Sequence, residues 1–242
     1  MAAAGPASIS DPQPNIGVRA AVGMVVGTAL LALVVVGAVV SASGHRLASG
    51  PPVAPPAPVA ATAEVQWALE SRKAAVGELS ATLPSRPFTC GTQPRAMPPT
   101  LSSAITCSTI VHGDYTETSD WSAVSGIGVV TDDLVDQTSL LGTGQLVFNA
   151  LRSYYFPNTT TTTKERKALP SNAAATGKSM IVTGNVGYSI KGLSSTYDRL
   201  VVVVFQLADG THAAWFVVRP NDTPRAILDV LNAAADTVTV RH

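Results

Sequence analysis

The side chains that could do chemistry in this chain are few and widely spaced. The histidines are His45, His112, His212 and His242. No two of them have the spacing that places two metal ligands on one face of a helix. Serines are plentiful, but none lies in the G-x-S-x-G pattern of a nucleophile elbow. The sequence therefore predicts no catalytic residue, no metal site and no cofactor, and the chain is expected not to be an enzyme.

Two local patterns resemble known motifs for binding phosphate or a metal ion. The segment 175–179, ATGKS, resembles the end of a phosphate-binding loop, but that motif needs a glycine where Asn172 stands and a helix afterwards, whereas strand-like residues follow. Asp132, Asp133 and Asp136 form a DDxxD arrangement whose carboxylates could hold a divalent cation. Because no second acidic cluster has a matching spacing, we expect a solvated turn before a helix.

The two cysteines, Cys90 and Cys107, are separated by a proline-rich stretch. A single pair at this spacing is what an oxidising compartment would join as a disulfide. The alternative is two separate buried thiols in a reducing compartment. The pairing, if present, favours a domain that lies outside the cytoplasm.

Residues 20–42 form an uncharged apolar run. A helix of this length spans about 34 Å at about 1.5 Å per residue, enough to cross a bilayer. The alternative is a cleavable signal peptide that ends near Ala42, although signal peptides have a shorter apolar region. Gly23 and Gly27 form a small-xxx-small pair that would allow two such helices to pack closely and the chain to form a homo-oligomer.

The domain organisation follows from these segments. Residues 1–19 are expected to be a cytoplasmic tail, 20–42 a transmembrane helix, 43–61 a Pro/Ala-rich linker and 62–242 an extracytoplasmic domain. Arg19 and Arg46 flank the apolar run on both sides, so charge alone does not orient it. The cysteine pair therefore decides the orientation, with the N-terminus inside the cytoplasmic membrane and the domain outside.

Hydrophobic periodicity predicts the elements of the domain. It indicates a helix over 62–84, strands over 105–111 and 122–131, a helix from about 143 to 156, strands over 179–190, 198–207 and 212–219, a helix after Pro224 and a short strand over 237–240. Thr223 is expected to cap the last helix. Together these predict one α+β domain with a mainly antiparallel sheet packed on helices.

The C-terminal part resembles actinobacterial envelope proteins of the LpqN and alanine-proline-rich antigen type. The resemblance is carried by the layout of 144–165, 184–192, 198–220 and 223–240, and by the Pro/Ala-rich segment before the domain. It implies a Mog1/PsbP-like α/β/α sandwich and a binding role without catalysis. The chain departs from the lipidated members of that group because it has no lipid-acceptor cysteine.

Sixteen basic and sixteen acidic residues give a net charge of zero. Nucleic acid is therefore excluded as a partner, because phosphate binding needs a basic surface. We expect a membrane-anchored, non-enzymatic binding protein of the actinobacterial cell envelope whose partner is an envelope protein, glycan or lipid. The alternatives are an accessory structural subunit of a larger membrane complex and, less favoured, an extracytoplasmic hydrolase.

Overall fold

A computed structural model describes residues 63–116, 119–157, 159–170 and 179–241. The expected transmembrane span with Gly23 and Gly27, the expected linker and most of the phosphate-loop-like segment lie outside these residues. Among the described residues, no helix has the length and apolar character needed to cross a membrane. The predicted anchor therefore stays a prediction.

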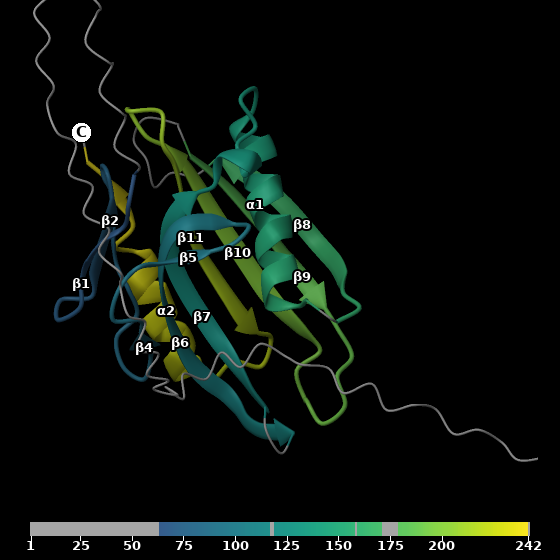
Figure 1. Ribbon diagram of the computed structural model, residues 1–242. Coiled ribbons are helices and arrows are strands. Elements are labelled where there is room, and N and C mark those ends of the chain that lie inside the picture. Colours follow the sequence, from purple (N-terminus) through teal and green to yellow (C-terminus); the bar gives the residue numbers. More distant parts are fainter. Residues whose placement is uncertain (1–62, 117–118, 158, 171–178, 242) are drawn as a thin grey trace, which may run out of the picture. The chain divides into compact units, whose positions relative to one another are not determined.

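The centre of the fold is an eight-stranded antiparallel sheet (Figure 1). Its spatial order is β4-β6-β7-β11-β10-β9-β8, and β5 pairs with β6. The strands are β4 (Thr89–Cys90), β5 (Arg95–Met97), β6 (Leu101–Thr116), β7 (Ser119–Val130), β8 (Thr162–Pro170), β9 (Ser179–Gly187), β10 (Tyr197–Gln206) and β11 (His212–Pro220). β10 lies inside the sheet, and its run of buried valines suits a strand that is covered on both faces.

Helix α1 (Leu140–Tyr155) covers one face of this sheet over β9 and β10. Its start is fixed by Ser139, whose hydroxyl accepts a hydrogen bond from the backbone N–H of Gly142 at 3.1 Å. Val147, Phe148 and Leu151 are fully buried and form a core with the apolar side chains of that sheet face. The helix predicted from about 143 is therefore confirmed and begins three residues earlier.

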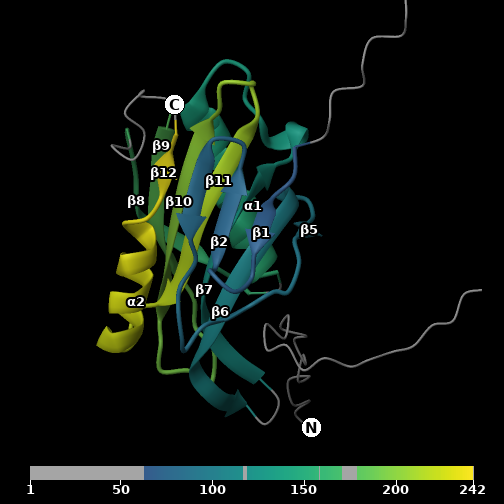
Figure 2. The same ribbon diagram turned by 90° about the vertical axis from the view of Figure 1, so that its left-hand side faces the viewer.

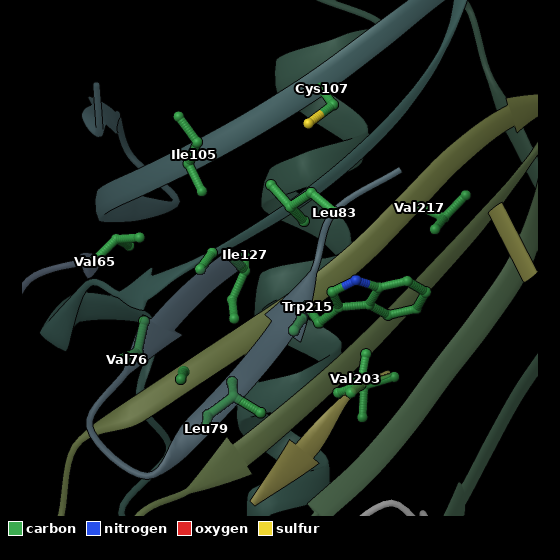
Figure 3. Close-up of a cluster of buried hydrophobic side chains, with 14 of the residues drawn as sticks. Val65, Val76, Leu79, Leu83, Ile105, Cys107, Ile127, Val203, Trp215 and Val217 are labelled. Carbon is green, nitrogen blue, oxygen red and sulfur yellow. The ribbon is translucent and has the colours of Figure 1, made fainter. Parts of the chain in front are cut away.

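The opposite face is covered by a small sheet and helix α2 (Arg225–Ala235). The small sheet has the order β1-β2-β3-β12, with β1 (Gln66–Ala68), β2 (Lys73–Val76), β3 (Leu79–Thr82) and β12 (Thr239–Val240). Figure 2 shows these elements on the side of the large sheet away from α1. Figure 3 shows the core between the layers, where Val76, Leu79 and Leu83 pack toward Ile127 and Trp215.

The helix predicted over 62–84 is wrong, because this segment forms β1, β2 and β3. Val76 pairs with Leu79 across a two-residue turn in which Gly77 has a φ of +52°, a conformation that glycine adopts without strain. On each side of this turn, from Ala74 to Leu83, buried residues alternate with partly buried ones. This two-residue period is typical of a strand. The spacing of the larger apolar residues happened to fit the helical period as well.

The other predicted elements are confirmed, with small differences. β6, β7, β9, β10, β11, α2 and β12 occupy the expected regions. The hydroxyl of Thr223 does not cap α2 but donates to the carbonyl of Pro220 at 2.6 Å, and Pro224 takes the cap position. Strand β8 was not predicted. The DDxxD segment forms a short turn, the 3-10 helix Asp132–Leu134, before α1, as expected.

Candidate functional site

The structure joins Cys90 and Cys107 by a disulfide that links β4 to the long strand β6. Beside it lies a small pocket of about 380 Å³ that includes Arg72, Arg86 and Phe88. The guanidinium of Arg72 donates to the backbone carbonyls of Pro84 and Phe88 and to the sulfur of Cys90. These bonds tie the Arg72 side chain to the loop that carries the disulfide, so its role is structural.

Among the described residues, His112 is the histidine that forms an ion pair. Its Nε2 lies 2.9 Å from a carboxylate oxygen of Asp222. The hydroxyl of Ser194 donates to the other oxygen at 2.9 Å. Burial raises the pKa of Asp222, but the hydrogen bonds from His112 and Ser194 outweigh it and leave that pKa lowered. In a nucleophile triad the imidazole lies between serine and carboxylate, whereas here the carboxylate lies between the other two. This cluster therefore does not activate Ser194.

The remaining candidates from the sequence are not brought together. His212 lies on β11, and His45 and His242 are outside the described residues. The carboxylate of Asp136 accepts hydrogen bonds from the backbone and hydroxyl of Thr138, which lower its pKa. Within the described parts of the chain, no group of three or more His, Cys, Asp or Glu side chains is arranged to hold a metal ion.

A buried carboxyl at the start of β10 was missed by the sequence analysis. Asp198 is only 2% exposed, and it accepts hydrogen bonds from the indole N–H of Trp121 at 3.1 Å and from the hydroxyl of Tyr188 at 2.5 Å. Burial raises the pKa of Asp198 to about 7, although both hydrogen bonds favour the charged form. Burial, followed by the charge of Asp198, also raises the pKa of Tyr188.

Aromatic rings enclose this carboxyl. The ring of Trp121 lies 5.0 Å from that of Tyr188, 5.9 Å from that of Phe156 and 6.0 Å from that of Tyr115. Tyr188 therefore has its hydroxyl fixed inward by Asp198 and its ring fixed by packing, which holds the end of β9 in one position.

The adjoining loop is fixed by Asn221, whose side-chain oxygen accepts hydrogen bonds from three groups. These are the hydroxyl of Ser195 at 2.7 Å and the backbone N–H groups of Thr196 at 2.9 Å and Tyr197 at 3.2 Å. The hydroxyl oxygens of Tyr188 and Ser195 lie 3.0 Å apart, within hydrogen-bond distance. The strand ends beside the buried carboxyl are therefore held by a connected set of side chains.

A groove of about 610 Å³ lies at these strand ends, on β8, β9, β10 and the adjoining loops. Its lining combines polar groups with a somewhat larger apolar surface and consists of Thr160, Thr162, Lys164, Asn185, Gly187, Tyr188, Ser189, Thr196 and Tyr197. Register explains the arrangement, because Thr162 pairs with Gly187 and Gly187 with Tyr197 across three neighbouring strands. The groove offers hydroxyl, amide and ammonium groups and the half-buried ring of Tyr197 to a ligand. We name it the strand-end groove.

The strand-end groove could not be predicted from the sequence, because the groove depends on the pairing of β8 with β9. The threonine-rich segment before Lys164 lies outside the elements predicted from periodicity, because it lacks the apolar alternation that marks a half-buried strand. Once β8 pairs with β9, Thr162 lies beside Gly187, which in turn pairs with Tyr197 at the start of β10.

No family model and no curated protein matches the chain. The chain is similar to the solution structure of cyanobacterial PsbP (CyanoP) from Synechocystis sp. PCC 6803, with 8% sequence identity and a TM-score of 0.40. The similarity covers 78% of this chain and 99% of that one. The resemblance to LpqN-type envelope proteins remains a separate prediction.

Proposed function

We propose that this protein is a membrane-anchored, non-enzymatic binding protein of the actinobacterial cell envelope, and that its strand-end groove holds a glycan outside the cytoplasmic membrane. The observation that carries the proposal is the mixture of hydroxyl, amide and ammonium groups with apolar surface in this groove, on strand ends that the side chain of Asn221 holds in place. The predicted apolar span and the disulfide support the anchored, extracytoplasmic placement.

The chemistry of the lining favours a glycan over a lipid chain. An acyl chain would cover the hydroxyl groups of Thr160 and Thr162 and offer them no hydrogen bonds, and each unsatisfied buried group costs about 1–3 kcal/mol. Sugar hydroxyls both donate and accept, so they match such a lining. The Tyr197 ring adds an apolar surface for the carbon-bound face of a sugar.

A catalytic role is less favoured by the same geometry. The Asp198 carboxyl lies on the face of β10 opposite to the groove and is enclosed by Trp121 and Tyr188. Ser195, which shares the partner Tyr188 with Asp198, is buried and hydrogen-bonded to Tyr188 and Asn221. A hydrolase would need a base and a nucleophile that both face the ligand.

The test uses the full chain in a mild detergent and measures its binding to neutral and acidic oligosaccharides by isothermal titration calorimetry. Thr162 is exposed and lines the groove, so Thr162→Trp should fill the groove, leave the fold intact and abolish binding. Thr239→Trp, at an exposed position of β12 in the small sheet, is the matched control and should bind like the unmodified chain. Equal affinity in both variants, or no binding of any oligosaccharide, would contradict the proposal.

A further inference from the structure

Three cationic side chains form one row across the large sheet beside the strand-end groove. Lys164 on β8 pairs with Asn185 on β9, Asn185 with Arg199 on β10, and Arg199 with Arg219 on β11. Directly paired residues of neighbouring strands lie on the same face of a sheet. We call these four residues the cationic row.

The cationic row borders the strand-end groove directly. Lys164 and Asn185 line the groove. The adjacent row of paired residues on the same face, Thr162, Gly187 and Tyr197, lines it as well. A charged group of a ligand in the groove would therefore lie next to the row.

The row places like charges opposite each other. Arg199 and Arg219 are direct cross-strand partners, an arrangement that destabilises a sheet unless something compensates for it. Burial, and then the charge of Arg199, lowers the pKa of Arg219, so this guanidinium is held in a position where its charge is unfavourable. A row of this kind gains stability when an anion binds.

No acidic side chain that the structure describes forms an ion pair with the cationic row. Within the described residues, the ion pairs are those of Asp222 with His112 and of Asp229 with Arg225. Asp198 contributes a favourable charge to Arg219, but its carboxyl lies on the opposite face of β10 and accepts its hydrogen bonds from Trp121 and Tyr188.

The guanidinium of Arg199 is oriented within the row. It donates from Nη1 to the side-chain oxygen of Asn185 at 2.9 Å. Asn185 belongs to the groove lining, so this bond directs the Arg199 guanidinium toward the groove wall. A guanidinium presents planar paired donors that suit a carboxylate.

We propose that the ligand of the strand-end groove is an acidic glycan, with its carboxylates against Lys164, Arg199 and Arg219 and its hydroxyls against the threonines of the lining. This inference rests on the proposed glycan-binding function and narrows it to one class of ligand. Both parts use the same groove: the threonines provide hydrogen bonds to any sugar, and the cationic row selects those with a negative charge.

The test compares two probes that differ only in charge. The first is a hyaluronan tetrasaccharide, which carries glucuronate carboxylates, and the second is the same tetrasaccharide with its carboxyl groups reduced to alcohols. Binding of each to the full chain in a non-ionic detergent is measured by calorimetry at low and at high salt. The acidic probe should bind at least about tenfold more tightly, and its advantage should shrink as salt screens the charges.

Variants assign the preference to the row. Lys164 is exposed, so Lys164→Gln should leave the fold intact and weaken binding of the acidic probe about fivefold to tenfold without affecting the neutral one. Arg219→Gln should also weaken binding of the acidic probe and leave binding of the neutral probe unchanged. Circular dichroism checks that this variant keeps its fold. Lys73→Gln, at an exposed position on β2, is the matched control and should change neither affinity.

The outcomes separate this inference from the function on which it rests. If both probes bind equally, the acidic preference is wrong and glycan binding stands. If the acidic probe is preferred but Lys164→Gln and Arg219→Gln retain the full preference, the cationic row is not its cause and the inference falls. If neither probe binds, and no other oligosaccharide does, the inference and the proposed function both fall.

Discussion

Asp198 should make the fold less stable as the pH rises through the neutral range. Its pKa is about 7 in the fold, against 3.8 for an ordinary aspartate. Between these values the folded chain holds a proton that the unfolded chain has released, so the free energy of unfolding falls with increasing pH. Below about pH 4 the stabilisation is complete, and above about pH 7 it is lost. The full difference corresponds to about 4 kcal/mol.

The perturbation is Asp198→Asn. The amide keeps a carbonyl oxygen to accept from Trp121 and Tyr188 and carries no charge at any pH. The variant should therefore match the unmodified chain near pH 4 and exceed its stability by up to about 4 kcal/mol near pH 8. The assay is urea unfolding of the full chain in detergent, followed by tryptophan fluorescence at each pH from 4 to 8.

Asp222→Asn is the control for this experiment. The pKa of Asp222 is lowered, so Asp222 stabilises the fold above its ordinary pKa, and this stabilisation is lost as the pH falls. Asp222→Asn should thus retain the loss of stability between pH 4 and 7. If Asp198→Asn and the unmodified chain lose stability in parallel over this range, the assignment of the effect to Asp198 is refuted.

Three further predictions concern the framework. Replacing both cysteines by alanine should lower the free energy of unfolding by about 3 kcal/mol, because the disulfide closes a loop of 17 positions, and reductant should then have no effect on stability. In thermal melts, Gly128→Ala should cost about 1–3 kcal/mol because its Cβ would lie 2.6 Å from the backbone oxygen of Ser103. Gly113→Ala should be tolerated, because its Cβ would make only ordinary van der Waals contacts, the nearest at 3.7 Å from the side chain of Ile110. Changing Gly23 and Gly27 to isoleucine should abolish any oligomer that cross-linking detects in detergent, and an unchanged oligomer would exclude this packing face.

The sequence predicts an element well when residues within that element or its adjoining turn are enough to determine its conformation. The valine run of β10 and the Ala208-Asp209-Gly210 turn indicate a hairpin by themselves, and Gly210 has the positive φ, +87°, that such a turn uses. The closing helix α2 is equally local, because its apolar residues recur at the helical period after a proline.

The first part of the domain could not be predicted because distant residues decide it. β3 is completed by β12, near the other end of the chain, and the backbone N–H of Thr82 donates to the hydroxyl of Thr237 at 2.8 Å. A segment with apolar residues at both periods takes the conformation that this partner stabilises. Local propensity contains no information about such a partner.

The cationic row was hidden for a related reason. Its members Lys164, Asn185, Arg199 and Arg219 come from four strands, and only the register of these strands places them side by side. A shift of one residue would move any of them to the other face. Asp198 was missed in the same way, since a polar residue at the start of an apolar run is more often exposed.

Amide hydrogen exchange on the full chain, with and without the hyaluronan tetrasaccharide, tests directly whether the strand-end groove is the binding site. Binding in the strand-end groove should protect the amides of 160–164, 185–189 and 196–197 and leave those of 72–90, around the disulfide, unchanged. Protection confined to the disulfide region, or unchanged exchange at saturating tetrasaccharide, would contradict the claim that this groove is the binding site.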